Sequence, residues 1–344
     1  MEERKSKKNL VWQVPFLVLL IVGTILIIRQ QHNMPYQHHS GMVFGTFYNI
    51  TYQSDQDLQQ PIEKVLSQVD GEFSMFNEAS AVSKFNRNEP VTLSPVFLRV
   101  FRASQTVSTE TDGAFDVTVA PLVNAWGFGF KQQQMPTALQ VDSLLTFVGM
   151  GKLRFDEAAG TIAKASPQMM LDFSAIAKGF GADQVAQLLR QRGVENFMVE
   201  IGGEVVTRGI SPHRVPWRIG VTKPTEDTLQ QAGELQTVLN VTDRAMATSG
   251  NYRNFYYKGG RKYAHTIDPR TGFPVQHSLL SATVLAQDCA TADAYATSFM
   301  VLGVDRAKAV LERHPELMAY FIYTDDQGQL ATWYSPSLRD KIAD

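Results

Sequence analysis

The hydrophobic pattern of the chain begins with one long apolar run near its N-terminus. Residues Leu10 to Ile28 contain no ionisable side chain, and four basic side chains lie just before them, within residues 4–8. A helix of about 19 residues is long enough to cross a bilayer core of roughly 30 Å. Because basic flanks stay in the cytoplasm, the pattern predicts a basic cytoplasmic tail over residues 1–9, a transmembrane signal anchor over 10–28 and an exported remainder.

Two other interpretations of this segment fit the sequence less well. A cleavable signal peptide needs a shorter apolar region and a cleavage site of small residues, and no A-x-A pattern follows Ile28. A lipid anchor needs a cysteine just after the apolar run, whereas the single cysteine is Cys289. We therefore expect an uncleaved anchor, followed by a polar linker over residues 29–40.

From Gly41 onward the pattern is typical of one globular body. Alternation from Phe44 to Tyr52 predicts a strand, and apolar residues at helical spacing from Leu58 to Phe73 predict a helix. The pair Ser94-Pro95, a cap followed by a first-turn proline, predicts the start of another helix. Further helices are expected over 139–148, 175–192 and 290–302 and after a cap at Asp305, and strands over 197–201, 204–208, 217–221, 235–241, 255–257, 262–265 and 280–286, with two more meeting at 325–328.

The order of these elements indicates the fold class. Helices and strands are mixed without strict βαβ alternation, which favours an α+β fold. We expect a single large mixed α/β body of two lobes over residues 41–344, preceded by the transmembrane helix, because no repeat or low-complexity tract divides this part of the sequence.

Composition narrows the classes of function. The formal net charge is -2, and one cysteine is present among 344 residues. A near-neutral balance argues against a nucleic-acid-binding protein, which needs a clustered basic surface. A single cysteine excludes an intrachain disulfide framework and a zinc site made of several thiolates.

Two clusters in the first half of the body are too polar or glycine-rich to be scaffold alone. The segment GAFDVTVAPLVNAWGFG spans Gly113 to Gly129, and its aromatic residues fit either a packed turn or a loop that stacks on a ring. The segment LDFSAIAKGFGAD spans Leu171 to Asp183 and places Lys178 in the early turns of a predicted helix. Because helix N-termini favour anions, Lys178 indicates either a bound anion such as phosphate or a solvated side chain.

Two more clusters lie in the second half. Gly202-Gly203 permits positive φ or a close backbone approach between two strands. His265 precedes the turn DPRTG and is either a general base or a structural histidine. Asp293 and Thr297 share a helix face at i, i+4, which suits Mg²⁺ completed by phosphates and waters or a local hydrogen bond at the helix start.

Taken together and in this order, the clusters resemble the ApbE family of FAD:protein FMN transferases. Each sequence word alone is weak, but eight words in one order are specific and cover the chain from Gly41 to about Leu302. The words are Gly45-Thr46, SAVSKFN (80–86), GAFDVTVAPLVNAWGFG, DFSAIAKGFGAD, IGGEV (201–205), ATSGNY (247–252), HTIDPRTG (265–272) and ATADAYATS (290–298).

The resemblance implies an enzyme with FAD as its substrate and Mg²⁺ as its metal. It implies transfer of FMN to a threonine hydroxyl of an acceptor protein, with release of AMP. The implied acceptors are flavoproteins with an Asp/Ser-Gly-x-Thr-Ser/Ala motif, such as subunits of membrane redox complexes. Together with the predicted anchor, it implies a single-pass protein of the bacterial inner membrane with its catalytic domain on the periplasmic side.

Residue roles follow from the same resemblance. His265 matches the catalytic histidine, and the metal ligands match the backbone carbonyl of Ala175 and the side chains of Asp293 and Thr297. Phe44 stands where the family usually has methionine, which keeps the flavin pocket apolar. The residues implied to line the FAD site are Phe44, Phe76, Ala114, Phe115, Asp116, Asp172, Lys178 and Ile267.

Two other functions use the same residues. A Mg²⁺-dependent FAD pyrophosphatase would use water in place of the acceptor threonine and yield FMN and AMP. A non-catalytic flavin-binding protein is disfavoured, because binding alone does not need Lys178, Asp293, Thr297 and His265 together.

Overall fold

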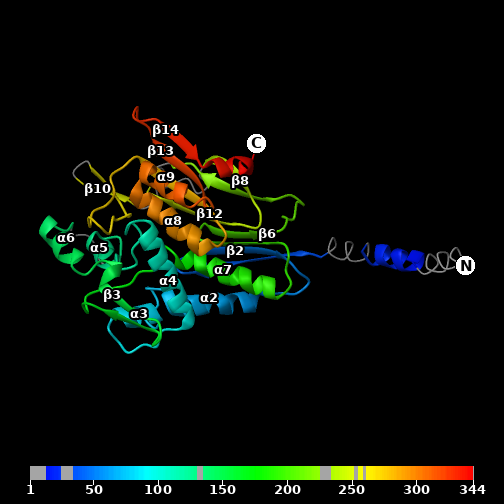
Figure 1. Cartoon of the computed structure of the whole chain (residues 1–344), viewed down its shortest axis with the longest axis horizontal. Coiled ribbons are helices and arrows are strands. Elements are labelled where there is room, and N and C mark those ends of the chain that lie inside the picture. The colour runs from blue at the N-terminus through cyan, green and yellow to red at the C-terminus, as the bar shows by residue number, and fades with distance from the viewer. Residues whose placement is uncertain are drawn as a thin grey trace, which may run out of the picture.

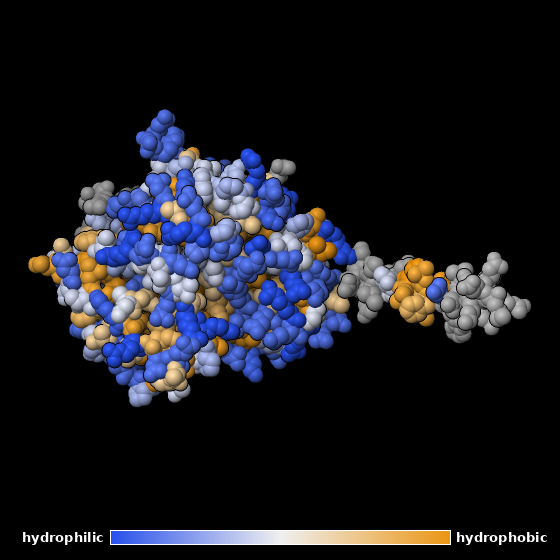
Figure 2. All heavy atoms as spheres, in the orientation of Figure 1, coloured by the Kyte–Doolittle hydropathy of each residue, from blue (hydrophilic) through white to orange (hydrophobic). Residues whose placement is uncertain are grey.

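The computed structural model describes residues 13–24, 34–129, 135–224, 234–251, 255–258 and 261–343. Residues 13–24 form a helix outside the body (Figure 1), and its apolar side chains are exposed, as Figure 2 shows. The expected tail and the rest of the expected anchor, residues 1–9, 10–12 and 25–28, lie outside the described residues. Within the described ranges, no helix is both long enough and apolar enough to cross a membrane.

The body is built on an antiparallel sheet, which among the described residues has eight strands. The order across the sheet is β1-β2-β5-β6-β9-β12-β13-β14, and each neighbouring pair is antiparallel. The strands are β1 (Tyr36–Val43), β2 (Thr46–Gln53), β5 (Phe197–Ile201), β6 (Glu204–Arg208), β9 (Ala245–Gly250), β12 (Leu279–Ala286), β13 (Met318–Thr324) and β14 (Leu330–Tyr334). Three hairpins stand outside it: β3 (Leu153–Asp156) with β4 (Thr161–Lys164), β7 (Trp217–Thr222) with β8 (Leu235–Val241), and β10 (Phe255–Lys258) with β11 (Arg261–Ala264).

Helices cover one face of the sheet, and a hairpin covers part of the other (Figure 1). Along β13, Ala319 and Phe321 pack toward the helices, whereas Tyr320 and Ile322 pack toward β7, β8 and η2 (Pro336–Lys341). This period of two follows from the pleat of a strand. The helices are α2 (Gln59–Phe73), α3 (Ala81–Asn86), α4 (Pro95–Glu110), α5 (Ala120–Ala125), α6 (Ala138–Leu145), α7 (Ala177–Gln191), α8 (Cys289–Leu302) and α9 (Val304–Arg313), with a short η1 (Met150–Lys152).

These elements confirm the predicted mixed α/β body. The structure gives β5, β6 and β8 the bounds predicted from the sequence, and α4 begins at Ser94-Pro95 as expected, with the Ser94 hydroxyl accepting a hydrogen bond from the Phe97 N–H. Helix α8 is buried nearly all round because it lies between the sheet and other helices.

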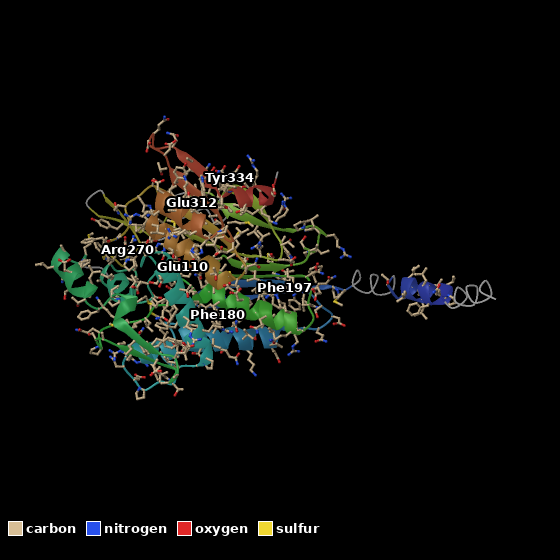
Figure 3. The ribbon with its side chains drawn as sticks, in the orientation of Figure 1. Glu110, Phe180, Phe197, Arg270, Glu312 and Tyr334 are labelled. Carbon is tan, nitrogen blue, oxygen red and sulfur yellow. The ribbon has the colours of Figure 1, made fainter. Side chains whose placement is uncertain are left out.

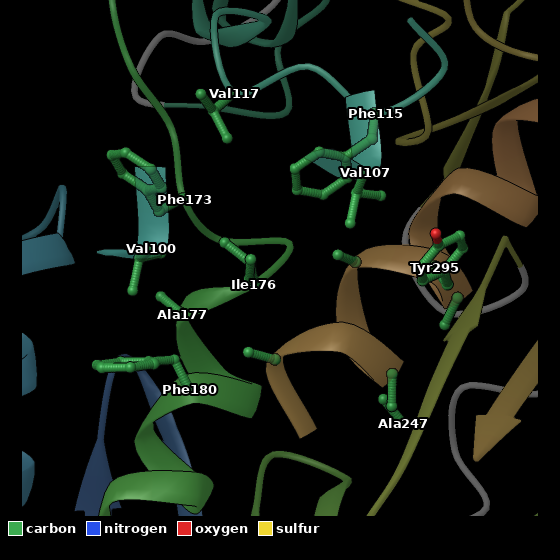
Figure 4. Close-up of a cluster of buried hydrophobic side chains, with 14 of the residues drawn as sticks. Val100, Val107, Phe115, Val117, Phe173, Ile176, Ala177, Phe180, Ala247 and Tyr295 are labelled. Atoms are coloured by element: carbon green, nitrogen blue, oxygen red, sulfur yellow. The ribbon is translucent and has the colours of Figure 1, made fainter. Parts of the chain in front are cut away.

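The largest apolar cluster fixes the start of α7. Figure 4 shows Phe173, Ile176 and Ala177 at this point, packed between Val100 of α4 and the residues of α8. A second, smaller cluster lies under α5 and α6, where Trp126 is buried.

Three local expectations are wrong. Residues 36–40 belong to β1 rather than to a linker, because they pair with β2 through ladder bonds and through side chains such as His39, which contacts the Tyr52 hydroxyl at 3.0 Å. Phe44 lies in the turn before β2, with a φ of 52°, so the strand begins at Thr46. Asp305 lies in the first turn of α9, and Gly303 occupies the cap position.

Candidate functional site

A cavity of about 1150 Å³ opens beside the end of the sheet and receives residues from distant parts of the chain. Its wall combines β2, the β5–β6 turn, the start of α7, one face of α8, and the loops near Phe76 and His265. The predicted site residues on this wall are Phe76, Ala114, Phe115, Asp116, Asp172, Ala175, Lys178, His265, Ile267, Asp293 and Thr297.

Phe44 is the one predicted site residue that the structure does not place on this wall. Its ring packs instead against α7, where its Cε2 atom would lie 2.8 Å from a Cβ added to Gly181. The side chain is partly buried and packs against the largest apolar cluster and against another one between α7 and the sheet, which includes Ile50 and Phe197. In this position it supports the cavity wall from behind and does not line it.

One end of the cavity holds a buried cluster of charge. The Lys178 ammonium lies 3.1 Å from Oε1 of Glu204 and 3.6 Å from Oδ2 of Asp293. It also donates a hydrogen bond to the Ser174 carbonyl at 3.2 Å. The two carboxylate side chains are only 5% and 3% exposed. Two protein carboxylates therefore lie beside Lys178, whose side chain is 27% exposed, so it is not a free lysine on an exposed face.

Close packing of backbone positions this cluster. Gly179 lies so near α8 that an added Cβ would come within 2.3 Å of the Cys289 carbonyl oxygen. The approach lets the Gly179 N–H donate to Oδ2 of Asp293 at 3.1 Å. Gly202 and Gly203 adopt φ angles of 66° and 105° in the β5–β6 turn, as their sequence predicts. That turn places Glu204 opposite Lys178.

A carboxylate from another helix holds the start of α8. Asp183 of α7 accepts hydrogen bonds from the backbone N–H groups of Cys289, at 2.8 Å, and Ala290, at 2.9 Å. Burial raises the pKa of Asp183 to about 7, although these backbone donors oppose the rise. Because α8 carries Asp293 and Thr297, this contact fixes their position relative to α7.

Burial also shifts the pKa values of the charged cluster. Burial raises the pKa of both Asp293 and Glu204, and the nearby Lys178 charge acts in the opposite direction. For Lys178, burial lowers the pKa, but Asp293 and Glu204 outweigh that effect and hold it above its usual value. The ammonium is therefore fixed in its charged form at neutral pH.

The oxygen donors near Asp293 fit a hard cation such as Mg²⁺. Asp293 and Thr297 lie one turn apart on α8, and both reach the cavity wall together with Ala175. The Thr297 hydroxyl is 3.1 Å from the Ser249 hydroxyl, whereas Asp293 accepts a hydrogen bond from the Gly179 N–H. The two side chains therefore have different hydrogen-bond partners. Among the described residues, no group of three or more His, Cys, Asp or Glu side chains forms a metal cluster. This set suits Mg²⁺, which commonly uses one or two carboxylates and fills its remaining positions with phosphates and waters.

Two other predicted acidic residues have local hydrogen-bonding roles. Asp116 accepts through Oδ1 from the Thr118 backbone N–H at 2.7 Å and through Oδ2 from the Met150 N–H at 3.0 Å. Burial raises its pKa. Asp172 accepts from the Ser174 N–H at 2.8 Å. Both side chains order the loops that form the cavity wall.

Another part of the cavity wall is aromatic. The rings of Phe128 and His265 meet edge to face with their centroids 6.3 Å apart, and both residues line the wall. Trp126 is buried and donates from Nε1 to the Gly272 carbonyl at 2.8 Å. The sequence left two interpretations of segment 113–129 open, and each fits one of its aromatic residues. Trp126 is packed inside the protein, and Phe128 faces the cavity.

An ion pair closes the loop after His265. The Arg270 guanidinium donates to both carboxylate oxygens of Asp268 at 2.8 Å. The Arg270 side chain, labelled in Figure 3, lies 3.8 Å from the place of a Cβ on Gly113. These contacts join the His265 loop to the start of the 113–129 segment.

Glu204 is the main functional candidate for which the sequence analysis predicts no role. It stands inside the word IGGEV, and only the fold shows that the glycine turn before it brings it to Lys178. Ser249 and Arg218, which also line the cavity, were likewise without a predicted role. One signal could have identified Glu204. It is an acidic residue that directly follows a Gly-Gly turn between two predicted strands.

Comparison with known proteins gives one consistent family. The ApbE family model matches residues 44–321. The FAD:protein FMN transferase of Haemophilus influenzae is 39% identical to the chain, covering 84% of it and 87% of the relative. The FAD:protein FMN transferase of Escherichia coli K12 is 33% identical, covering 94% and 96%. The solved structure of the flavin transferase ApbE from Vibrio cholerae superposes with a TM-score of 0.80 at 36% identity, covering 90% of this chain and 99% of that one.

The fold and the relatives together define a transferase with a mixed α/β body. The chain belongs to the ApbE family.

Proposed function

We propose that the chain is an FAD:protein FMN transferase that moves FMN from FAD to a threonine hydroxyl of an acceptor protein and releases AMP. The observation that supports this most strongly is the common position of Lys178, His265, Asp293 and Thr297 on the wall of one cavity. These residues occupy the sequence words that resemble the family, and the relatives named FAD:protein FMN transferase match nearly the whole body.

The buried charged end is suited to the phosphates of FAD. Lys178 would lie beside phosphate oxygens and stabilise the negative charge that gathers on the AMP leaving group. Asp293, Thr297 and the carbonyl of Ala175 would hold Mg²⁺. When bound there, Mg²⁺ would supply further positive charge for the phosphate oxygens.

His265 is suited to activate the acceptor. A threonine hydroxyl is a weak nucleophile until a base removes its proton, and a histidine side chain accepts protons near neutral pH. In the proposed step, His265 accepts the threonine proton as the threonine oxygen bonds to the FMN phosphorus. The bond between that phosphorus and the AMP oxygen breaks, and AMP leaves with the electron pair.

The open rim of the cavity is suited to ring and peptide contacts. Phe47 and Phe76 line the cavity and are 66% and 75% exposed. Because the acceptor is a protein, the reacting phosphorus must be reachable from the surface. The rim would therefore take the flavin and an acceptor segment of the Asp/Ser-Gly-x-Thr-Ser/Ala type, in flavoproteins such as subunits of membrane redox complexes.

We further propose that residues 10–28 anchor the chain in the bacterial inner membrane, with the body on the periplasmic side. The apolar run and its basic N-terminal flank support this orientation. Residues 41–344 would then form the exported catalytic domain.

The labelling of an acceptor domain tests the proposed activity. We expect incubation with FAD and Mg²⁺ to give acceptor fluorescence that survives denaturation, because the flavin is joined through a phosphoester bond. The matched control replaces the acceptor threonine with valine and should stay unlabelled. Release of FMN and AMP with an unlabelled acceptor would instead support a Mg²⁺-dependent FAD pyrophosphatase.

A further inference from the structure

Glu204 is buried in an unusual environment. Oε1 faces the Lys178 ammonium at 3.1 Å, whereas Oε2 is buried and, among the described residues, has no hydrogen-bond partner. A buried carboxylate oxygen without a partner is unfavourable unless another interaction compensates. The structure therefore retains a charged group that the proposed chemistry has not yet used.

The charges around Lys178 are not balanced. One ammonium is shared by the carboxylates of Glu204 and Asp293, at 3.1 Å and 3.6 Å. If Asp293 binds a divalent cation, that cation comes to lie near the Lys178 ammonium, and the two positive charges repel each other at short range. A second carboxylate beside the lysine removes most of that repulsion.

We propose that Glu204 is a positioning residue that neutralises Lys178 and so allows the ammonium and Mg²⁺ to be held side by side at the phosphate end of the cavity. This inference rests on the proposed function, because it takes Mg²⁺ to bind at Asp293 and Thr297. Glu204 acts on the metal through Lys178 and is not itself a ligand.

The β5–β6 turn is shaped for this carboxylate. A Cβ on Gly202 would come within 3.3 Å of Oε2 of Glu204 and within 2.8 Å of Cγ2 of Thr46. The glycine therefore leaves room for the Glu204 side chain to turn toward Lys178. The positive φ at both Gly202 and Gly203 makes the turn tight enough to bring β6 back at this point.

The chain also provides a matched control. Glu200 lines the same cavity from β5, but its Oε2 accepts a hydrogen bond from Asn49 Nδ2 at 3.2 Å. Glu200→Gln removes the same charge from the cavity as Glu204→Gln and leaves the Lys178 cluster in place. A general effect of cavity charge would appear in both variants.

The test is the dissociation constant of Mg²⁺, measured by calorimetry at one fixed pH on the protein with FAD bound and no acceptor present, so that the FAD phosphates can complete the coordination. We expect Glu204→Gln to weaken Mg²⁺ binding by about tenfold, and Glu200→Gln to weaken it by about twofold or less. In a Lys178→Met background the repulsion is absent, so adding Glu204→Gln should change the dissociation constant by about threefold or less. Glu204→Asp keeps the charge and should recover part of the lost affinity.

Each outcome decides the proposal. An equal loss in the wild-type and Lys178→Met backgrounds would mean that Glu204 acts on the metal directly, which overturns the inference, as would no loss in Glu204→Gln. If Glu204→Gln lowers the melting temperature so far that the protein is unfolded in the assay, Glu204→Asp takes its place. That variant should lose less Mg²⁺ affinity than Glu204→Gln, and only when Lys178 is present. Wild-type protein that binds no Mg²⁺ would remove the metal from the proposed function, a failure that is distinct from a Glu204 variant without effect.

Discussion

The two ends of the cavity differ in burial and in the elements that build them. At the charged end, Lys178, Glu204 and Asp293 come from α7, β6 and α8, and the carboxylates are almost fully buried. At the rim, Phe47 and Phe76 come from the start of β2 and the loop after α2, and both are largely exposed. The comparison indicates that one end is ordered before any ligand binds, whereas the other offers apolar surface for a ligand to cover.

This difference predicts different kinetic effects. Fixed charges in a buried site stabilise developing charge strongly, because they need no reorganisation during the reaction. An exposed ring contributes mainly through the area that a ligand buries. Changes at the charged end should therefore lower kcat, and changes at the rim should mainly raise KM.

The largest effect is expected for Asp293→Asn. The amide keeps the shape of the side chain but loses the charge that would bind Mg²⁺, so transfer should fall by more than about 10⁴-fold. FAD affinity, measured by quenching of flavin fluorescence, should fall much less. A variant that transfers FMN normally would show that the metal lies elsewhere.

The next effect is expected for His265→Gln. Loss of a general base typically lowers the rate by about 10² to 10⁴-fold, and Gln retains a hydrogen-bonding group near Phe128. Single-turnover labelling of the acceptor should slow by this factor while FAD affinity changes by about twofold or less. An unchanged rate would remove His265 as the base.

A smaller effect is expected for Thr297→Val. The change keeps the volume but removes the hydroxyl that faces Ser249, and we expect Mg²⁺ to bind about 10- to 100-fold more weakly. Thr297→Ser keeps the hydroxyl and is the matched control. Equal affinities for Mg²⁺ in the Val and Ser variants, measured by calorimetry, would show that the hydroxyl is not a ligand.

A still smaller effect is expected at the rim for Phe76→Ala. The ring is mostly exposed, so thermal stability should not change, but KM for FAD or acceptor should rise by about three- to tenfold. The kcat should stay near that of the wild type. A large fall in kcat with an unchanged KM would contradict the separation between the two ends.

The smallest effect concerns the support of the charged end. Burial raises the pKa of Asp183 to about 7, above the value of about 3.9 of an unfolded chain. The folded state then binds more protons between these values, so this group makes stability fall as the pH rises from about 4 to 7.

Asp183→Asn does not titrate and should lack this contribution. The melting temperature of the wild type relative to the variant should therefore decrease by roughly 5 to 8 °C across the same range. If the melting temperatures of the wild type and of Asp183→Asn change with pH in parallel, Asp183 does not titrate in this window.

The sequence was informative where local rules decide the structure. Helix starts such as Ser94-Pro95 and turns such as Gly202-Gly203 follow from backbone chemistry, and the structure confirms them. Each polar cluster supplied residues to the cavity, because neighbours within one cluster stay together in the fold. That the separate clusters meet in one cavity does not follow from their spacing.

The remaining features depend on long-range contacts. Glu204 meets Lys178 only because β6 and the start of α7 face the same cavity. Phe44 leaves the cavity wall because the tight β1–β2 turn directs its ring to Gly181. The periodicity of the sequence predicts neither contact, because both depend on how the elements pack together.

The most direct test of the account is the intact mass of an acceptor domain after incubation with FAD, with Mg²⁺ or with a chelator. The account predicts that the acceptor gains the mass of one FMN less one water with Mg²⁺, that AMP appears in equal amount, and that neither occurs with the chelator or with Asp293→Asn. An acceptor of unchanged mass beside FMN and AMP, or equal labelling with the chelator, would contradict it.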